Sequence, residues 1–300
     1  MNKIYKDKEQ FEQLILKVSQ DLHINETIIE KDFYVTLILK ELVKRCPNII
    51  FKGGTSLSKC FKLINRFSED IDISFNGNAS QGERRLINHT IMDIVEELGF
   101  ELSNKDEIKS RRDYNKFEIE YPAIFKLDAL KKRVVIETVF SINAYPTEKK
   151  IATSIIYDYL EKNQLINLIN EFKNEPFEVC VQSINRTFID KIFAICDYYI
   201  SGDIKEHSRH LYDIFKLMPI IHFDNDFIEL VKKIRKDRKE KKYCFSADEK
   251  YKINELLDKI IKEEIYKSDY KNVTEKILYE SVSYDDTIET IKSIIEKNVL

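Results

Sequence analysis

One stretch of the 300-residue chain decides the fold, and it consists of Phe51-Lys-Gly-Gly-Thr-Ser-Leu-Ser-Lys-Cys-Phe61 followed by Ser68-Glu-Asp-Ile-Asp-Ile-Ser74. The short apolar run that ends at Phe51 predicts a buried strand, and Gly53-Gly54 predicts a tight turn after it. Apolar residues then return at helical spacing, which predicts a short helix. Polar and apolar residues alternate from Asp70 to Phe75, which predicts a second strand beside the first.

The turn between the first strand and the helix has the features of a phosphate-binding loop. Gly53 and Gly54 allow the backbone to bend sharply and to approach a ligand closely. The helix that starts at about Thr55 or Ser56 presents unpaired N–H groups and a partial positive charge in its first turn. The hydroxyl groups of Thr55 and Ser56 can cap that helix or donate to phosphate oxygens.

Asp70 and Asp72 supply the second part of the pattern. Because they lie two residues apart on a strand, both carboxylates point to the same face. They repel each other unless a cation lies between them, and Mg²⁺ prefers such oxygen ligands. A phosphate-binding turn followed by a carboxylate pair is what metal-assisted nucleotidyl transfer requires. Each pattern alone is also common as plain structure, at turns and on exposed strand faces.

Glu137 is the candidate for a third carboxylate. It lies within Val134–Phe140, an otherwise apolar segment that predicts a buried strand. A carboxylate buried there needs a cation, a proton or a metal to offset the loss of water. One interpretation is an ion pair with Lys131, Lys132 or Arg133. The other is a metal ligand that also acts as general base toward an attacking hydroxyl.

The remaining pattern predicts an α/β (α+β) fold in three regions. Residues 1–47 are predicted to form an N-terminal helical arm, in which Asn25 is the N-cap of the second helix. Residues 48–145 should form the catalytic core with a small mixed β-sheet. Residues 146–300 are predicted to be mainly helical, apart from a short strand at Phe177–Val181.

Composition excludes several classes of protein. The chain has 49 Lys and Arg against 52 Asp and Glu, a net charge of −3, so the whole molecule is not an obvious polyanion binder. Five scattered cysteines without a Cys-x-x-Cys pair argue against a disulfide framework and a cysteine-based zinc site. The sequence lacks an N-terminal signal peptide and any apolar stretch that could span a membrane, so we expect a cytoplasmic protein. The basic run Lys232–Lys242 is either a solvated helix face or a contact for an RNA backbone.

The first motif resembles that of a known enzyme family. Gly53-Gly-Thr-Ser56 followed by Glu69-Asp-Ile-Asp72 is similar to the first motif of DNA polymerase β-type nucleotidyltransferases. More narrowly, it resembles the AbiEii/AbiGii toxin family, to which the MenT toxins also belong. The resemblance implies the nucleotidyltransferase fold and transfer of a nucleoside monophosphate from an NTP. It also implies two Mg²⁺ ions held by Asp70, Asp72 and, by its position in a strand alone, Glu137.

Three further segments extend the resemblance over residues 29–217. Ile29–Val35 is similar to the Glu-Lys-Asp helix of the family. Thr187–Ala194 resembles the motif with a phosphate-contacting lysine, which places that role on Lys191. Arg209–Phe215 resembles the Arg-His-x-Tyr-Asp motif, which implies nucleotide binding by Arg209 and a functional acid at Asp213.

The residues of these later segments also have structural interpretations. Lys191 lies on a largely apolar helix and needs an anionic partner, which could be Asp190, Asp32 or a triphosphate. Arg209 and Asp213, four residues apart on a helix, could simply pair.

The resemblance carries expectations about the acceptor and the biological role. It implies an RNA acceptor, the 3′ end of tRNA, and a toxin that a cognate antitoxin neutralises in a toxin–antitoxin or antiviral abortive-infection system. Three alternatives stay open on the residues: modification of a protein hydroxyl (AMPylation), modification of a small molecule such as an aminoglycoside, and nucleotide binding without turnover. We expect no membrane partner.

Overall fold

The computed structural model describes residues 7–75, 77, 79–109, 113–125, 132–172 and 175–300. These divide into two compact units, which are described separately. The first unit comprises Met1–Phe61, Ser68–Ser141 and Thr147–Val181. The second comprises Lys62–Phe67, Ile142–Pro146 and Gln182–Leu300.

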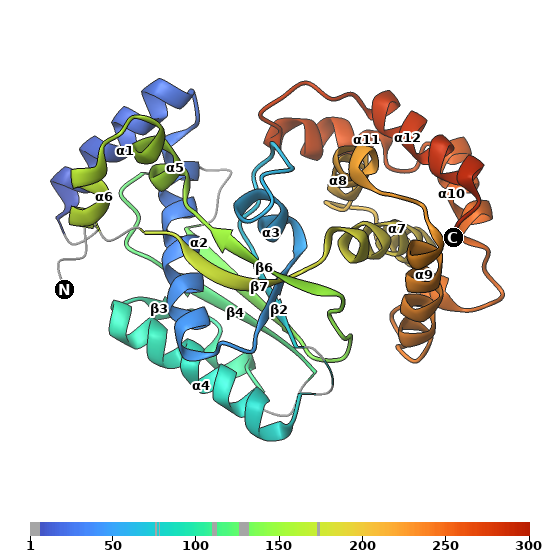
Figure 1. Ribbon diagram of the computed structural model, residues 1–300, viewed down its shortest axis with the longest axis horizontal. Coiled ribbons are helices and arrows are strands. Elements are labelled where there is room, and N and C mark those ends of the chain that lie inside the picture. Colours follow the sequence, from blue (N-terminus) through green and yellow to red (C-terminus); the bar gives the residue numbers. More distant parts are fainter. Residues whose placement is uncertain (1–6, 76, 78, 110–112, 126–131, 173–174) are drawn as a thin grey trace. The chain divides into compact units, whose positions relative to one another are not determined.

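The first unit begins with two helices, and the sequence predicts the cap at which the second one starts (Figure 1). Helix α1 (Lys8–Leu22) buries Phe11, Ile15 and Val18 along one stripe, as an amphipathic helix does. Helix α2 (Glu26–Arg45) starts at Asn25, whose side chain accepts a hydrogen bond from the Thr27 N–H at 2.9 Å. Eleven of the twenty residues of α2 are buried, so the helix lies largely inside the unit.

A mixed β-sheet forms the centre of the first unit. Its strands are β1 (Ile50–Lys52), β2 (Ile71–Ser74), β3 (Glu101–Leu102), β4 (Tyr114–Glu120), β5 (Arg133–Val139), β6 (Thr147–Ala152) and β7 (Phe177–Gln182). Within the described residues their order is β3-β4-β5-β2-β1-β7-β6. Strands β1 and β2 are neighbours, as the sequence predicts, and they run antiparallel. Strand β2 pairs in parallel with β5. The predicted α/β fold class is therefore confirmed.

Four further helices complete the first unit. They are α3 (Gly53–Lys59), α4 (Gln81–Leu98), α5 (Ile155–Lys162) and α6 (Ile166–Phe172). Helix α3 follows β1 without a linker and contacts both β1 and β2. Helices α4 and α5 each contact α2, so the apolar side chains of α2 join the helical layer to the buried face of the sheet.

The second unit is helical. Its longer elements are α7 (Ile184–Ser201), α8 (Arg209–Leu217), α9 (Asn225–Lys239), α10 (Ile253–Glu263) and α12 (Tyr284–Lys297), with the short α11 (Lys267–Asp269) before α12. Helix α8 packs on α7 and α12. The segment Lys62–Phe67 belongs to this unit because it pairs with residues near Leu278: the Phe67 N–H donates to the Ile277 carbonyl at 2.9 Å.

The two units divide the chain differently from the three predicted regions. The N-terminal helices share one core with the sheet rather than forming a separate arm. Residues 147–181 add the strands β6 and β7 to the same sheet, so the boundary falls after Val181 and not near Pro146. None of the helices in the described ranges is long and apolar enough to cross a lipid bilayer.

Candidate active site

The turn at Gly53 lies directly against the Asp72 carboxylate. Strands β1 and β2 are in register so that Lys52 is opposite Asp72, which brings the second strand to the glycine turn. Gly53 has a φ of +80°, and a Cβ atom added to it would lie 1.9 Å from Asp72 Oδ2. The backbone conformation and the close approach both require glycine. The predicted juxtaposition of the glycine turn and the carboxylate is therefore present.

Glu137 lies beside Asp72 on the same face of the sheet. The parallel register of β2 and β5 places Asp72 opposite Glu137, and both side chains are partly exposed. Residues at matching positions of neighbouring strands project to one face, so the two carboxylates are neighbours. Asp70 immediately precedes β2 and is also partly exposed.

A tyrosine hydroxyl connects these three carboxylates electrostatically. Tyr114 Oη on β4 donates a hydrogen bond to Glu137 Oε1 at 3.0 Å. Burial raises the pKa of the Tyr114 hydroxyl, and the charge of Glu137 raises it further, followed by the charges of Asp72 and Asp70. The charges of all three carboxylates, called the carboxylate patch below, therefore act on one hydroxyl group.

Three basic residues were considered as structural ion-pair partners of Glu137. Two of them do not pair with it, and the third lies outside the described residues. Arg133 binds Glu118 instead, and Glu137 makes no ion pair within the described residues. Lys131, another of the partners considered, lies outside those residues. Lys132 is exposed and forms no ion pair with Glu137.

The carboxylate patch has the donor chemistry for a hard divalent cation. Carboxylate oxygens are the ligands that Mg²⁺ takes from proteins, and two of them here are adjacent by strand register. The described residues contain no group of three or more His, Cys, Asp or Glu side chains already converged on one point.

The hydroxyl groups of Thr55 and Ser56 have partners within the protein. Both residues are buried on α3. Thr55 Oγ1 lies 2.9 Å from Ser68 Oγ, and Ser56 Oγ donates to the Gly53 carbonyl at 2.9 Å. These bonds close the turn and attach it to the segment that leads to Asp70. Phosphate contacts by Thr55 and Ser56 stay a prediction, as do those of the partly exposed glycines.

The Glu-Lys-Asp segment of α2 binds other segments of the first unit, one of which leads to Asp70. Glu30 is fully buried and accepts the backbone N–H groups of Ile124 and Phe125 at 2.7 and 3.1 Å. Lys31, 1% exposed, forms an ion pair with Glu69, the residue before Asp70. These structural roles of Glu30 and Lys31 were not predicted from the sequence.

Asp32 fixes the far end of α3. One of its oxygens lies 2.5 Å from the Lys59 ammonium, and the other accepts the Ile155 N–H at 2.8 Å. Lys59 is almost fully buried and also donates to Thr36 Oγ1 at 2.6 Å. Asp32 is therefore a supporting residue of the glycine turn, and it is not the anionic partner of Lys191.

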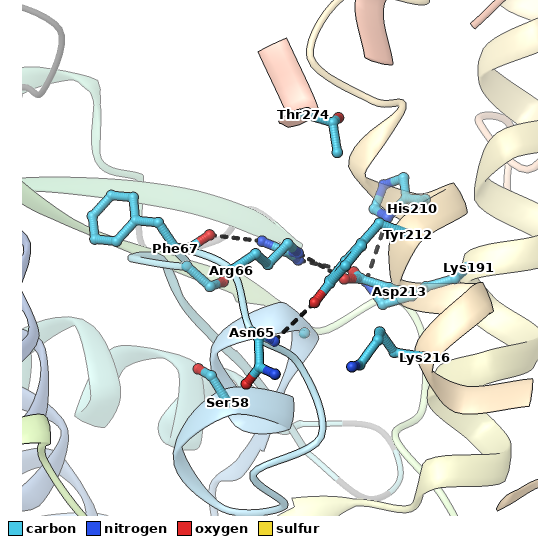
Figure 2. A network of polar contacts seen from close by, with 12 residues as sticks. Ser58, Asn65, Arg66, Phe67, Lys191, His210, Tyr212, Asp213, Lys216 and Thr274 are labelled. Carbon is cyan, nitrogen blue, oxygen red and sulfur yellow. Dashed lines mark hydrogen bonds and ion pairs between the residues drawn. The ribbon is translucent and has the colours of Figure 1, made fainter. Parts of the chain in front are cut away.

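The second unit contains a fully buried carboxylate shared by two cations (Figure 2). Arg66 forms two bonds to Asp213, from Nε at 2.7 Å and from Nη2 at 2.8 Å. Lys191 Nζ on α7 lies 2.5 Å from the same carboxylate. Burial by itself raises the pKa of Asp213, but the charges of Arg66 and Lys191 outweigh it and hold the pKa below its ordinary value.

This cluster has more positive than negative charge. Arg209 is partly buried and has no hydrogen bond or ion pair within the described residues. His210 Nδ1 lies 3.4 Å from Lys191 Nζ, and burial together with Lys191 and Arg209 lowers the pKa of His210 well below 6.5. Burial also lowers the pKa of Lys191. An anion would relieve this excess of positive charge.

The alternative pairings suggested for these residues are wrong. Asp213 binds Arg66 and Lys191 rather than Arg209. Asp190 serves Arg186 at 2.9 Å and Arg238 at 3.2 Å instead of Lys191. Sequence reasoning missed Arg66 as the main partner of Asp213, although Arg66 stands just before the carboxylate motif.

The basic run in and after α9 is partly structural. Arg238 is buried and binds Asp197 at 2.7 Å, and Arg235 donates to backbone carbonyls around Ala247. The exposed lysines lie on the opposite side of the helix from Val231 and Ile234. They are Lys232, Lys233, Lys236 and Lys239.

Comparison with known proteins gives the family. The model of the nucleotidyl transferase AbiEii toxin family, a type IV toxin–antitoxin system, matches residues 37–292. Among solved structures, the chain is similar to MenT4, a nucleotidyltransferase toxin from Mycobacterium tuberculosis H37Rv. The identity is 14% and the TM-score 0.49, over 94% of this chain and 88% of that chain. No curated protein gave a significant match. The family match covers most of both units and confirms the family resemblance, so the chain belongs to the AbiEii family of nucleotidyltransferase toxins from type IV toxin–antitoxin systems.

Proposed function

We propose that this nucleotidyltransferase is Mg²⁺-dependent and that Asp70, Asp72 and Glu137 hold the metal. The observation that supports the proposal is the register of β2 and β5, which sets Asp72 beside Glu137 next to the Gly53 turn. Two neighbouring carboxylates repel each other less when a cation binds between them. When bound, Mg²⁺ ions neutralise charge on the attacking and leaving oxygens.

The residues of the chain then have distinct tasks. Glu137 is the general base: its Oε1 accepts a hydrogen bond from a hydroxyl already, as a base must do with an attacking acceptor. The bend at Gly53 leaves room beside Asp72 that any other side chain would fill. Lys59 and Lys31 hold the two segments on either side of the patch through Asp32 and Glu69.

Lys191 and Arg209 bind the phosphates of the NTP in this proposal. Their cluster has three cationic side chains, counting Arg66, against the single Asp213 carboxylate. A triphosphate supplies the missing negative charge, and bonds to charged oxygens are stronger than neutral ones. Asp213 keeps Lys191 oriented and charged, which gives the predicted functional acid a positioning role.

The acceptor that we propose is an RNA hydroxyl, at the 3′ end of tRNA. Residues 232–242 contain eight Lys or Arg and only two Asp or Glu, although the chain as a whole is slightly acidic. Lys236 is exposed and has no ion pair within the described residues, and the neighbouring lysines pair only at the surface. Surface pairs are weak and exchange readily for phosphates.

The test is transfer of a labelled nucleotide to RNA. Purified protein with Mg²⁺, total tRNA and each of the four NTPs in turn, labelled at the α-phosphate, should label the tRNA. Asp70→Ala should abolish the label, whereas Asp106→Ala, at an exposed carboxylate on the first unit, should not. Labelling that survives in Asp70→Ala would refute the proposed metal site. A toxin of this family implies an antitoxin partner, whose addition should suppress toxicity in cells.

A further inference from the structure

Tyr114 has a position that nucleotidyl transfer to RNA does not explain. Its side chain is 46% exposed, yet its hydroxyl is bonded to Glu137 Oε1 at 3.0 Å. Other tyrosines of the chain also donate to carboxylates, for example Tyr145 to Asp237. Within the described residues, the distinctive feature of Tyr114 is that its acceptor lies in register with Asp72.

We propose that Tyr114 is itself an acceptor, so that the enzyme transfers a nucleoside monophosphate to its own tyrosine. The inference rests on the proposed transfer chemistry at Asp70, Asp72 and Glu137. The Tyr114 oxygen forms a new bond to the α-phosphorus of the NTP. The bond from that phosphorus to the oxygen that bridges to the β-phosphate breaks, and pyrophosphate leaves with the bonding electrons. The phenolic proton passes to Glu137.

The geometry meets the two requirements of such a step. The hydroxyl is within hydrogen-bond distance of the proposed base, as an attacking acceptor must be. It also belongs to the same rigid sheet as the carboxylates, since β4 pairs with β5 along its whole length and β5 pairs with β2. The hydroxyl and its proposed base are therefore on adjacent strands of one sheet, and the high local concentration of an attached group favours the reaction.

Modification of Tyr114 would limit the activity of the enzyme toward RNA. The added nucleotide would occupy the place beside Glu137 that an acceptor hydroxyl needs. A population of protein incubated with NTP alone should then lose its ability to label RNA as the tyrosine is modified. Such self-modification would limit the activity of the toxin and would require only the protein and its NTP substrate.

The experiment omits RNA. Full-length protein is incubated with Mg²⁺ and each labelled NTP, and the modified residue is found by peptide mass spectrometry. We expect one nucleotide per chain, on Tyr114, at a rate that does not change with protein concentration because the transfer is intramolecular. Asp70→Ala should give no label and Tyr114→Phe should lose it. Tyr243→Phe, at a tyrosine that is 51% exposed in the second unit, should keep it.

The outcomes separate this inference from the proposed function. Labelled tRNA without any modified Tyr114 would overturn the inference and leave the proposed function intact. Label on another residue, or a rate that rises with protein concentration, would overturn it as well. Absence of pyrophosphate and of any labelled product with every NTP, both with and without tRNA, would overturn both. The peptide map of the unaltered protein decides the question even if Tyr114→Phe fails to fold.

Discussion

The two clusters of charged residues differ in the sign of the charge that remains unbalanced. On the sheet, Asp72 and Glu137 stand side by side, partly exposed, with a tyrosine hydroxyl as the bonded neighbour of Glu137. In the helical unit, Asp213 is fully buried and binds Arg66 and Lys191, so positive charge is in excess. The charge of the first cluster favours a bound cation, and the charge of the second favours an anion.

The difference separates a carboxylate that is fully buried and paired with two cations from two carboxylates that are partly exposed. Asp213 is fully buried and binds Arg66 and Lys191. Its removal takes the shared carboxylate away from two buried cations, which is costly. Asp72 is partly exposed on the sheet, beside Glu137. Burial therefore distinguishes Asp213 from Asp72, although both are aspartates.

Asp72→Asn tests the chemical side of the comparison and has the largest expected effect. The change removes a charge from the proposed metal site with almost no change in volume, so nucleotidyl transfer should fall roughly 10³-fold or more. Stability should stay the same or rise slightly, because repulsion from Glu137 is relieved. Labelling assays and urea unfolding of the same preparation check both results. A variant that loses both stability and activity would contradict the assignment.

Asp213→Ala tests the structural side. It leaves Arg66 and Lys191 without their shared carboxylate in a buried position, so the free energy of unfolding should fall by about 3–5 kcal/mol. Denaturant unfolding measures the loss. Asp203→Ala, at an exposed carboxylate just before α8, is the matched control and should cost little. A cost for Asp213→Ala as small as that of the control would mean that the buried pair is not stabilising.

Gly53→Ala should harm activity more than its backbone strain predicts. At Gly53 an added Cβ meets the Asp72 carboxylate, whereas at Gly99 (φ +73°) it meets nothing within 4 Å. Both changes impose a left-handed backbone on alanine, at about 1–3 kcal/mol. Only Gly53→Ala should also displace Asp72 and abolish transfer. Equal activity in the two variants would show that the close approach at the turn is not needed.

His210 should make stability sensitive to mild acid, and this is the smallest effect. Its pKa in the folded protein lies well below 6.5, so as the pH falls below about 6.5 the unfolded chain takes up a proton that the native state refuses. The free energy of unfolding should therefore fall on acidification, with up to about 1.4 kcal/mol per pH unit from this group. The pKa of Asp213 is lowered as well, but its contribution is lost only below about pH 3.8.

The measurement is unfolding by urea between about pH 7 and about pH 5. His210→Gln should flatten the dependence on pH, since the amide can still accept a hydrogen bond from Lys191 but does not titrate. His222→Gln, at an exposed histidine, controls for loss of an imidazole. An unchanged slope in His210→Gln would show that another group is responsible.

Local features of the fold could be predicted because their causes are local. The cap at Asn25 and the turn at Gly53 depend on neighbouring residues only, and the structure confirms both. Strand β6 was missed because it is an edge strand: Thr147–Ala152 contains three charged residues, and its pattern does not alternate. The sequence of an edge strand resembles that of an exposed loop.

The candidate site could be predicted only in part, since its remaining contacts are distant in sequence. Asp70, Asp72 and the glycine turn lie within twenty residues of each other and form a recognisable motif. The neighbour of Asp72 is set by parallel pairing with β5, which no local pattern encodes. Arg66 and Asp213 are separated by 147 residues, so their bond became visible only in the folded chain.

The chain passes back and forth between the two units, and this has a consequence for how the protein can be divided. Lys62–Phe67 and Ile142–Pro146 leave the first unit for the second and return, so no single cleavage separates the units. A fragment that stops at Val181 would retain Arg66 but not Asp213. Arg66, which is buried in the full chain, would lose this partner. The helical unit is therefore not one contiguous segment that could be exchanged as a single piece of sequence.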